Sequence, residues 1–93
     1  MSRMIACVAF LDPARSVHTP TFVAAVEIAR ETILGPDTTI ALFDDAADAA
    51  TAQDVAHEIV AARASCVVGH FASAAAAAAA PVYRDAGIPL LLP

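Results

Sequence analysis

The chain has 93 residues, enough for one domain, and 59% of them are hydrophobic, which excludes a disordered chain. It has no lysine, and its net charge of -5 disfavours nucleic acid as a partner, because nucleic-acid binding relies on a basic surface. No apolar run approaches the roughly 18 residues that cross a bilayer, and residues 1–10 lack the pattern of a signal peptide. We therefore expect no membrane insertion and, if Met1 is the native start, a cytoplasmic protein.

The first third of the chain predicts a strand, a loop and a helix. Residues 4–10 (MIACVAF) form a near-continuous apolar run, as in a strand that is covered on both faces. A loop with the turn signal Asp12-Pro13 follows, and Thr19-Pro20 then predicts an N-cap and the first residue of a helix over 20–33. The predicted inward stripe of this helix is Phe22, Val26, Ala29 and Ile33. A glycine-proline pair ends it.

The middle third predicts a second strand and a second helix. Residues 39–43 (TIALF) read as the strand, and an acidic loop follows it. Asp48 is the predicted N-cap of a helix over 49–63, with Arg63 in the last turn, where a cation suits the helix dipole. The apolar stripe of this helix is Ala52, Val55, Ala56, Ile59 and Val60.

The last third repeats the pattern. Residues 66–69 (CVVG) predict a third strand, and seven consecutive alanines after Ser73 predict a helix that lies close to the sheet. Pro81 predicts a kink or a restart in this helix, because proline removes a backbone hydrogen bond. Gly87 is the predicted C-cap, and the apolar run from Ile88 to Leu92 is the fourth strand.

Alternating strands and helices predict one α/β domain over residues 1–93, with a Rossmann-like three-layer α/β/α architecture. Right-handed crossovers favour four parallel strands in the order 2-1-3-4, with helices on both faces. Sheets of this kind bind ligands outside the carboxyl ends of their strands. The turns that follow the first three strands are therefore the places where we expect a functional site.

Several chemistries are disfavoured at these turns. Three glycines, widely spaced, form no phosphate-binding loop or dinucleotide fingerprint, and no G-x-S-x-G elbow surrounds a serine. No paired histidine or cysteine spacing predicts a metal site, so we expect neither a metal nor a cofactor. Cys7 and Cys66 both lie in apolar runs, which predicts buried free thiols.

Three polar residues stand out at the predicted turns. Ser73 precedes the alanine-rich helix, so its hydroxyl and the first free N–H groups would form a carboxylate or anion site; the alternative is a simple N-cap. His70 would be a ligand contact or a general base, or else a turn histidine bonded to nearby backbone. His18 lies in a loop, where it would contact a ligand, pack or face solvent.

Four stretches resemble the amino-terminal lobe of type I periplasmic binding proteins, in the leucine/isoleucine/valine branch. They are AVEIARETI (25–33), LFDDAADA (42–49), VVGHFAS (67–73) and PVYRDAGIPLLLP (81–93). The resemblance implies that Ser73 binds the carboxylate of a ligand and that His18 stands where the family has a covering aromatic residue. The other predicted ligand-binding positions are Asp12, His70, Phe71 and Ala72.

The chain also departs from that family. The loop after the first strand lacks the family's G-P-x-[ST]-G pattern, and a disulfide often found there would join the positions of Ala47 and Ala72, neither of which is cysteine. The sequence reaches only Pro93, so the second ligand loop and the carboxyl-terminal lobe are not part of it. The resemblance thus implies half of a periplasmic-binding-protein-like fold.

Together, these features favour a module that binds a small carboxylate or amino-acid-like ligand, or another protein, and that works as an oligomer. The bare apolar strand 88–92 predicts a homodimer or a partner protein covering it. One alternative is a small cytoplasmic enzyme with His70, His18 and Asp12 as acid-base groups. Another is a truncated fragment that binds nothing. We expect a binding module rather than an enzyme.

Overall fold

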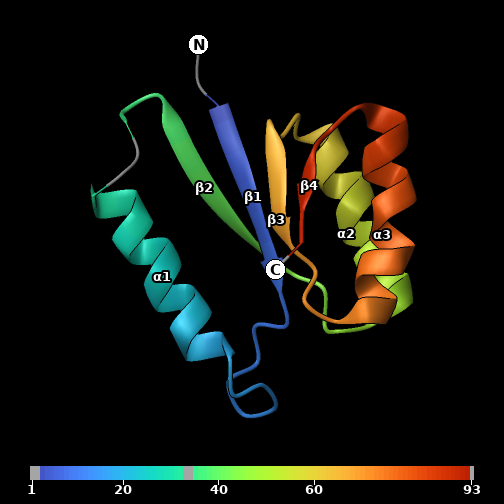
Figure 1. The fold of residues 1–93 in the computed structure, drawn as a ribbon, viewed down its shortest axis with the longest axis horizontal. Coiled ribbons are helices and arrows are strands. Elements are labelled where there is room, and N and C mark those ends of the chain that lie inside the picture. Colours follow the sequence, from blue (N-terminus) through green and yellow to red (C-terminus); the bar gives the residue numbers. More distant parts are fainter. Residues whose placement is uncertain (1–2, 33–34, 93) are drawn as a thin grey trace.

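A computed structural model describes residues 3–32 and 35–92, which form a four-stranded parallel sheet and three helices (Figure 1). The elements are β1 (Arg3–Ala9), α1 (Thr19–Thr32), β2 (Thr38–Asp44), α2 (Ala49–Ala61), β3 (Cys66–Gly69), α3 (Ser73–Ala86) and β4 (Leu90–Leu91). The strand order β2-β1-β3-β4 confirms the predicted topology and fold class.

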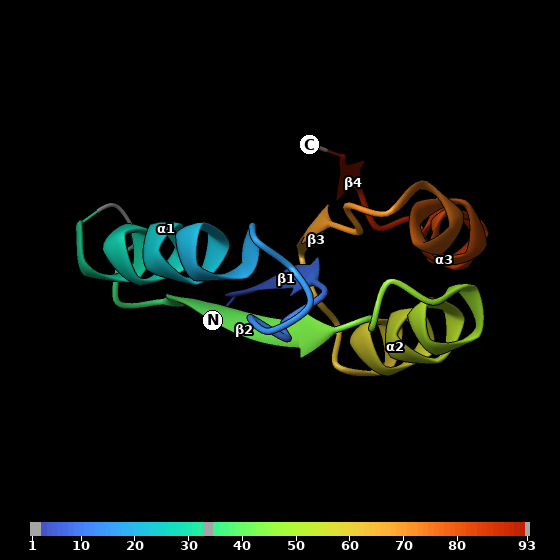
Figure 2. The ribbon, with the colours of Figure 1, turned by 90° about the horizontal axis from the view of Figure 1, so that it is seen from below.

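The three layers are unequal: α1 covers one face of the sheet, while α2 and α3 pack together on the other (Figure 2). The larger core lies on the α2–α3 face, where alternate residues of the strands point inward. Its residues with no exposed surface are Ala6, Val8, Ala52, Ala56, Ile59, Val67, Ala75, Ala79 and Tyr83. The predicted stripe of α2 is confirmed, and the alanines of α3 lie close to the sheet as expected. In the described part of the chain, no helix is long and apolar enough to cross a bilayer.

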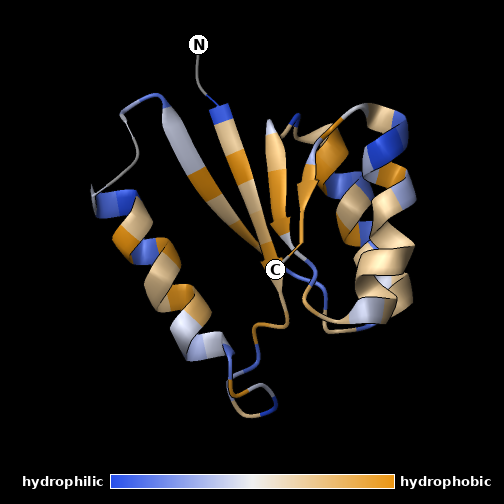
Figure 3. Cartoon of the chain, in the orientation of Figure 1, coloured by the Kyte–Doolittle hydropathy of each residue, from blue (hydrophilic) through white to orange (hydrophobic). Residues whose placement is uncertain are grey.

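The α1 face is covered less completely. Cys7 of β1 and Val26 of α1 are buried there, but the sheet continues beyond α1 to β3 and β4. Leu90 packs against the core on the other face, so its neighbour Leu91 points to the α1 side, where it is 58% exposed. Figure 3 shows the hydrophobic residues running along β1, β3 and β4. Ile33, predicted to complete the stripe of α1, lies outside the described residues.

Two predicted helix caps are confirmed. The Asp48 carboxylate accepts a hydrogen bond from the Thr51 amide at 2.9 Å, which satisfies a free N–H group at the start of α2. This hydrogen bond and a second one from the Thr51 hydroxyl lower the pKa of Asp48. Gly87 follows α3 with φ 71°, in the left-handed region, and its amide donates to the Arg84 carbonyl.

Helix α3 continues through Pro81 without a break, so the predicted restart does not occur; the carbonyl that Pro81 leaves without a donor belongs to Ala77, on the exposed side of the helix, where water can reach it. Three predictions about element ends need correction. Arg63 lies beyond the end of α2, with φ 60°. Thr19 is the first residue of α1 rather than its N-cap, and its hydroxyl donates to the Phe10 carbonyl at 2.6 Å. Strand β4 has two residues rather than five.

Both cysteines are free thiols, as predicted, but only one is buried. Cys7 is 6% exposed, whereas Cys66, near the start of β3, is half-buried. Burial raises the pKa of the Cys7 thiol, and the neighbouring Cys66 adds to this effect. The prediction of two buried thiols is therefore wrong for Cys66.

Candidate functional site

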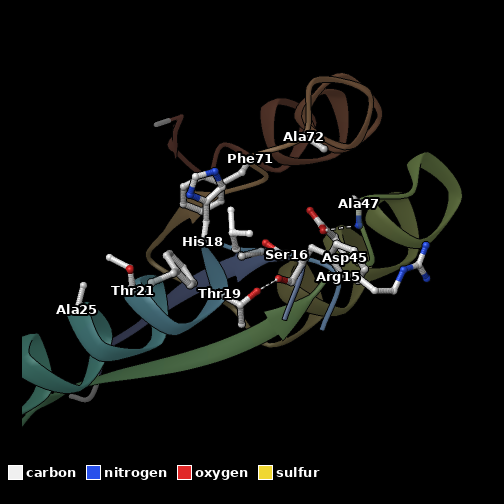
Figure 4. Close-up of a pocket in the computed structure, with 14 residues that line it drawn as sticks. Arg15, Ser16, His18, Thr19, Thr21, Ala25, Asp45, Ala47, Phe71 and Ala72 are labelled. Atoms are coloured by element: carbon white, nitrogen blue, oxygen red, sulfur yellow. Dashed lines mark hydrogen bonds between the residues drawn. The ribbon is translucent and has the colours of Figure 1, made fainter. Parts of the chain in front are cut away.

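A pocket of about 800 Å³ lies where the strands of the sheet end, as expected for a parallel α/β fold (Figure 4). The loops that follow β1 and β2, the turn that follows β3 and the first half of α1 surround it. Its lining residues are Ala9, Phe10, Arg15, Ser16, Val17, His18, Thr19, Thr21, Phe22, Ala25, Asp45, Ala47, Phe71 and Ala72. Most of these side chains are apolar, which is typical of a site for a small organic molecule.

Aromatic rings form two parts of the pocket wall. The rings of Phe22 and Phe71 meet edge to face, with centroids 5.1 Å apart and planes at 82°. The guanidinium of Arg15 lies 5.5 Å from the centroid of the Phe10 ring. Figure 4 shows Arg15 beside Ala47 at one end of the pocket. Arg15 and three phenylalanine side chains thus line a space that is otherwise mainly hydrocarbon.

Hydrogen bonds hold the loop between β1 and α1 in place. The Asp12 carboxylate accepts from the Ala14 amide at 3.0 Å, and the Asp12 carbonyl accepts from the amides of the next turn. This confirms the predicted turn at Asp12-Pro13. The Leu11 amide donates to the Asp44 carboxylate at 3.2 Å, which ties the loop to the end of β2. These bonds fix the part of the loop that leads into the pocket wall.

Three buried polar side chains form a network behind the pocket. Asp45 Oδ2 lies 3.1 Å from His70 Nδ1, and His70 Nε2 lies 2.7 Å from the Tyr83 hydroxyl. None of the three residues is more than 1% exposed. An ionised carboxylate only accepts, so His70 Nδ1 carries the proton that it donates to Asp45, and Nε2 shares a hydrogen bond with the Tyr83 hydroxyl. The network joins the end of β2, the turn after β3 and the last turn of α3.

The network sets the ionisation of its two outer members. Burial alone would raise the pKa of Asp45, but hydrogen bonds from His70 and from the Ala47 amide outweigh it and lower that pKa. Burial, together with the charge on Asp45, raises the pKa of the Tyr83 hydroxyl well above its ordinary value. The folded protein therefore keeps an ionised Asp45 and a neutral Tyr83.

The turn after β3 depends on a close backbone approach. Gly69 has φ 130°, and a Cβ atom at this position would lie 1.9 Å from the carbonyl oxygen of Val8. The next residue, His70, has φ 59°, and its amide donates to the same oxygen at 2.9 Å. Only glycine fits at position 69, and the turn that it permits brings Phe71 and Ala72 to the pocket.

Comparison with solved structures identifies the architecture. A benzoate complex of an ABC-transporter solute-binding protein from R. palustris superimposes with a TM-score of 0.76 at 18% identity, over 99% of this chain and 27% of that chain. The isoleucine complex of a branched-chain amino acid transporter substrate-binding protein from Streptococcus pneumoniae gives a TM-score of 0.74 at 24% identity, over 99% and 28%. This chain has the fold of a solute-binding-protein lobe.

A third structure agrees: an ABC-type branched-chain amino acid transporter protein from Rhodopseudomonas palustris has a TM-score of 0.70 at 22% identity, over 96% of this chain and 26% of that chain. The lobe therefore spans about a quarter of the length of these proteins, which confirms the predicted single-lobe fold. No protein-family model and no curated protein matches the chain.

The lobe brings together only part of the predicted site. His18, Phe71 and Ala72 line the pocket, whereas Asp12, His70 and Ser73 do not. Their roles in ligand binding remain predictions. His70 is bonded to two side chains rather than to nearby backbone, and neither of its ring nitrogens is free to contact a ligand.

The alternative interpretation of Ser73 as the N-cap is wrong. Ala72 occupies the cap position, and its side chain makes no capping hydrogen bond. Ser73 is the first helical residue and is exposed, one position along from the pocket wall. The first amides of α3 thus lack a side-chain partner beside the pocket.

Sequence reasoning missed other residues of the lobe. Arg15 and Phe22 line the pocket, and Tyr83 completes the buried network, yet none was a predicted site residue. Phe22 was assigned to the inward stripe of its helix, and that stripe begins at the pocket rather than over the sheet. Across residues 3–32 and 35–92, no cluster of three histidine, cysteine or acidic side chains is placed to hold a metal ion.

Proposed function

We propose that the chain is a module that binds a small carboxylate or amino-acid-like molecule at the carboxyl ends of β1, β2 and β3. The observation that carries this proposal is the pocket of about 800 Å³, which is large enough for such a ligand and mainly apolar. Its place at the strand ends is where parallel α/β sheets bind ligands. The likeness of the fold to proteins described in complex with benzoate and with isoleucine supports the same conclusion.

In this proposal, Ser73 and the first turn of α3 receive the ligand's carboxylate. The start of a helix carries partial positive charge and free N–H groups, and both favour an anion. The Ala72 side chain caps none of these groups, Ala72 lines the pocket, and the exposed Ser73 hydroxyl follows directly. A carboxylate placed at this end of the pocket would leave its apolar part against the phenylalanine rings.

Replacing Ser73 with alanine is therefore expected to weaken binding by about 1–2 kcal/mol, because one hydrogen bond to a charged group is lost. Calorimetric titration of the purified protein with benzoate and with isoleucine measures this effect. Ser65→Ala is the matched control, since Ser65 is exposed at the opposite end of β3. Equal affinities for the two variants would remove Ser73 from the site. No heat with either compound up to millimolar concentration would favour the non-binding alternative.

We also propose that the β4 edge of the sheet pairs with a second copy or with another protein. Support comes from the exposed apolar residues there: Leu91 and Leu92 are each 58% exposed, and among the described residues β4 pairs with a strand on one side only. Sedimentation velocity at micromolar concentration is expected to detect a dimer, and Leu91→Lys is expected to dissociate it. A monomer at these concentrations would contradict self-association, and a dimeric Leu91→Lys variant would move the contact elsewhere.

A further inference from the structure

We propose that the pocket selects a carboxylate with a flat apolar body and no α-amino group, such as an arylalkanoate, in preference to an amino acid. This inference rests on the proposed function and names the chemical class of its ligand. It follows from three features of the pocket: the sign of the charges around it, the engagement of the nearby carboxylates, and the aromatic wall.

Three positive groups and one buried carboxylate, Asp45, border the pocket. Arg15 contributes a full charge to its lining. Two helices also begin at its edge: Thr19, the first residue of α1, and Ala72, which precedes α3, both line the space. Each helix start carries roughly half a positive charge. All three groups attract a carboxylate and repel an ammonium group.

The carboxylates close to the pocket are already engaged. Asp45 is the acidic residue among the lining residues, but it is 1% exposed, and its two oxygens accept from the Ala47 amide and from His70. Asp44 and Asp12 are not among the lining residues; Asp44 Oδ1 accepts from the Leu11 and Ala46 amides, and Asp12 Oδ1 accepts from the Ala14 amide. Among the described lining residues, an α-ammonium group would therefore meet one carboxylate, that of Asp45, which is buried and has a hydrogen bond on each oxygen. Leaving such a charge unpaired is costly.

The aromatic wall fits a flat body. The edge-to-face pair of Phe22 and Phe71 borders the space, and rings prefer such edge or offset contacts over others. The Phe10 ring, which could otherwise stabilise an ammonium group through its π face, already carries the Arg15 guanidinium at 5.5 Å. The wall therefore offers contact to a ring but little to a cation.

Two pairs of compounds test the inference, since each pair differs only by the α-amino group. One pair is 3-phenylpropanoate and L-phenylalanine; the other is 4-methylpentanoate and L-leucine. In calorimetric titrations of the purified protein, we expect the member without the amino group to bind about tenfold more tightly in both pairs, the fold-change expected for one unpaired polar group. Between the two acids, we expect 3-phenylpropanoate to bind more tightly.

Two phenylalanine variants place the effect in this pocket. Phe22→Leu removes a ring from the wall. We expect it to weaken the binding of 3-phenylpropanoate several-fold and to change the affinity for 4-methylpentanoate little. Phe43→Leu is the matched control, because Phe43 lies on β2 and packs against the core on the opposite face of the sheet. We expect it to leave both affinities unchanged.

The outcomes separate this inference from the proposed function. Tighter binding of the amino acid in either pair would overturn the inference while supporting a small-molecule site. If Phe22→Leu and Phe43→Leu changed the affinities for both acids equally, the proposed contact between the ligand and the aromatic wall would be overturned. Failure of all four compounds to bind at millimolar concentration would overturn the inference and the carboxylate-binding proposal together.

Discussion

Replacing Gly69 with alanine is expected to lower the free energy of unfolding by about 4 kcal/mol or more, a large part of the stability of a small domain. A Cβ atom at this position would lie 1.9 Å from the Val8 carbonyl oxygen. The carbonyl is part of the backbone of β1, and the Cβ atom would be bonded directly to the backbone of β3. Neither group can therefore rotate away as the end of a flexible side chain would. The strands β1 and β3 would have to separate where the turn to the pocket begins.

The other two glycines supply controls for this effect. Gly87 has φ 71° but no atom within 4 Å of an added Cβ, so Gly87→Ala should cost only the conformational strain, about 1–2 kcal/mol. Gly35 has open space around it, and Gly35→Ala should change stability little. Urea unfolding followed by circular dichroism gives the three values. Similar midpoints for Gly69→Ala and Gly87→Ala would show that the strands tolerate the extra atom.

The second large effect is expected for Asp45→Ala, which should destabilise the fold by about 3 kcal/mol. The variant leaves the buried His70 N–H without an acceptor, in a place that water does not reach. Tyr83→Phe removes one hydroxyl and should cost less, about 1–2 kcal/mol. The adjacent Asp44 provides the comparison: it accepts two backbone amides but is exposed, so Asp44→Ala should have a smaller effect than Asp45→Ala.

The same network predicts how stability depends on pH. The pKa of Asp45 is lower in the folded protein than in the unfolded chain, so the ionised carboxylate stabilises the fold above the ordinary aspartate pKa of about 4. That contribution is lost as the pH falls through the lower, folded pKa. Denaturation midpoints measured from pH 6 downward should therefore fall more steeply for the unmodified chain than for Asp45→Asn. Parallel curves would contradict the lowered pKa.

The fold was predictable because its signals are local. Alternating apolar runs and helix stops define the four strands, and crossover handedness then restricts their order. The predictions that were wrong concern details that depend on contacts with the rest of the folded chain. Pro81 is tolerated because it lies on the exposed side of α3, which periodicity in an alanine tract cannot reveal. Strand β4 pairs with β3 only at Leu90 and Leu91, although the apolar run that predicted it is five residues long.

The candidate site was predictable only in outline. Strand ends indicate where a pocket should form, and three predicted residues, His18, Phe71 and Ala72, do line it. The partners of His70 were not predictable, because Asp45 and Tyr83 are 25 and 13 residues away in the chain. A buried histidine that joins three elements has the same local sequence as one that faces a ligand, and only the folded arrangement distinguishes them.

Tyr83 is the sole tyrosine of the chain, and the sequence contains no tryptophan. The tyrosine fluorescence of the chain therefore originates from one phenol ring, whose hydroxyl is hydrogen-bonded to His70 behind the pocket. The residue after His70 is Phe71, whose ring belongs to the pocket wall. The chain thus contains its own optical reporter, linked to the pocket wall through one hydrogen bond and one peptide bond, and its emission can be followed without attaching a dye.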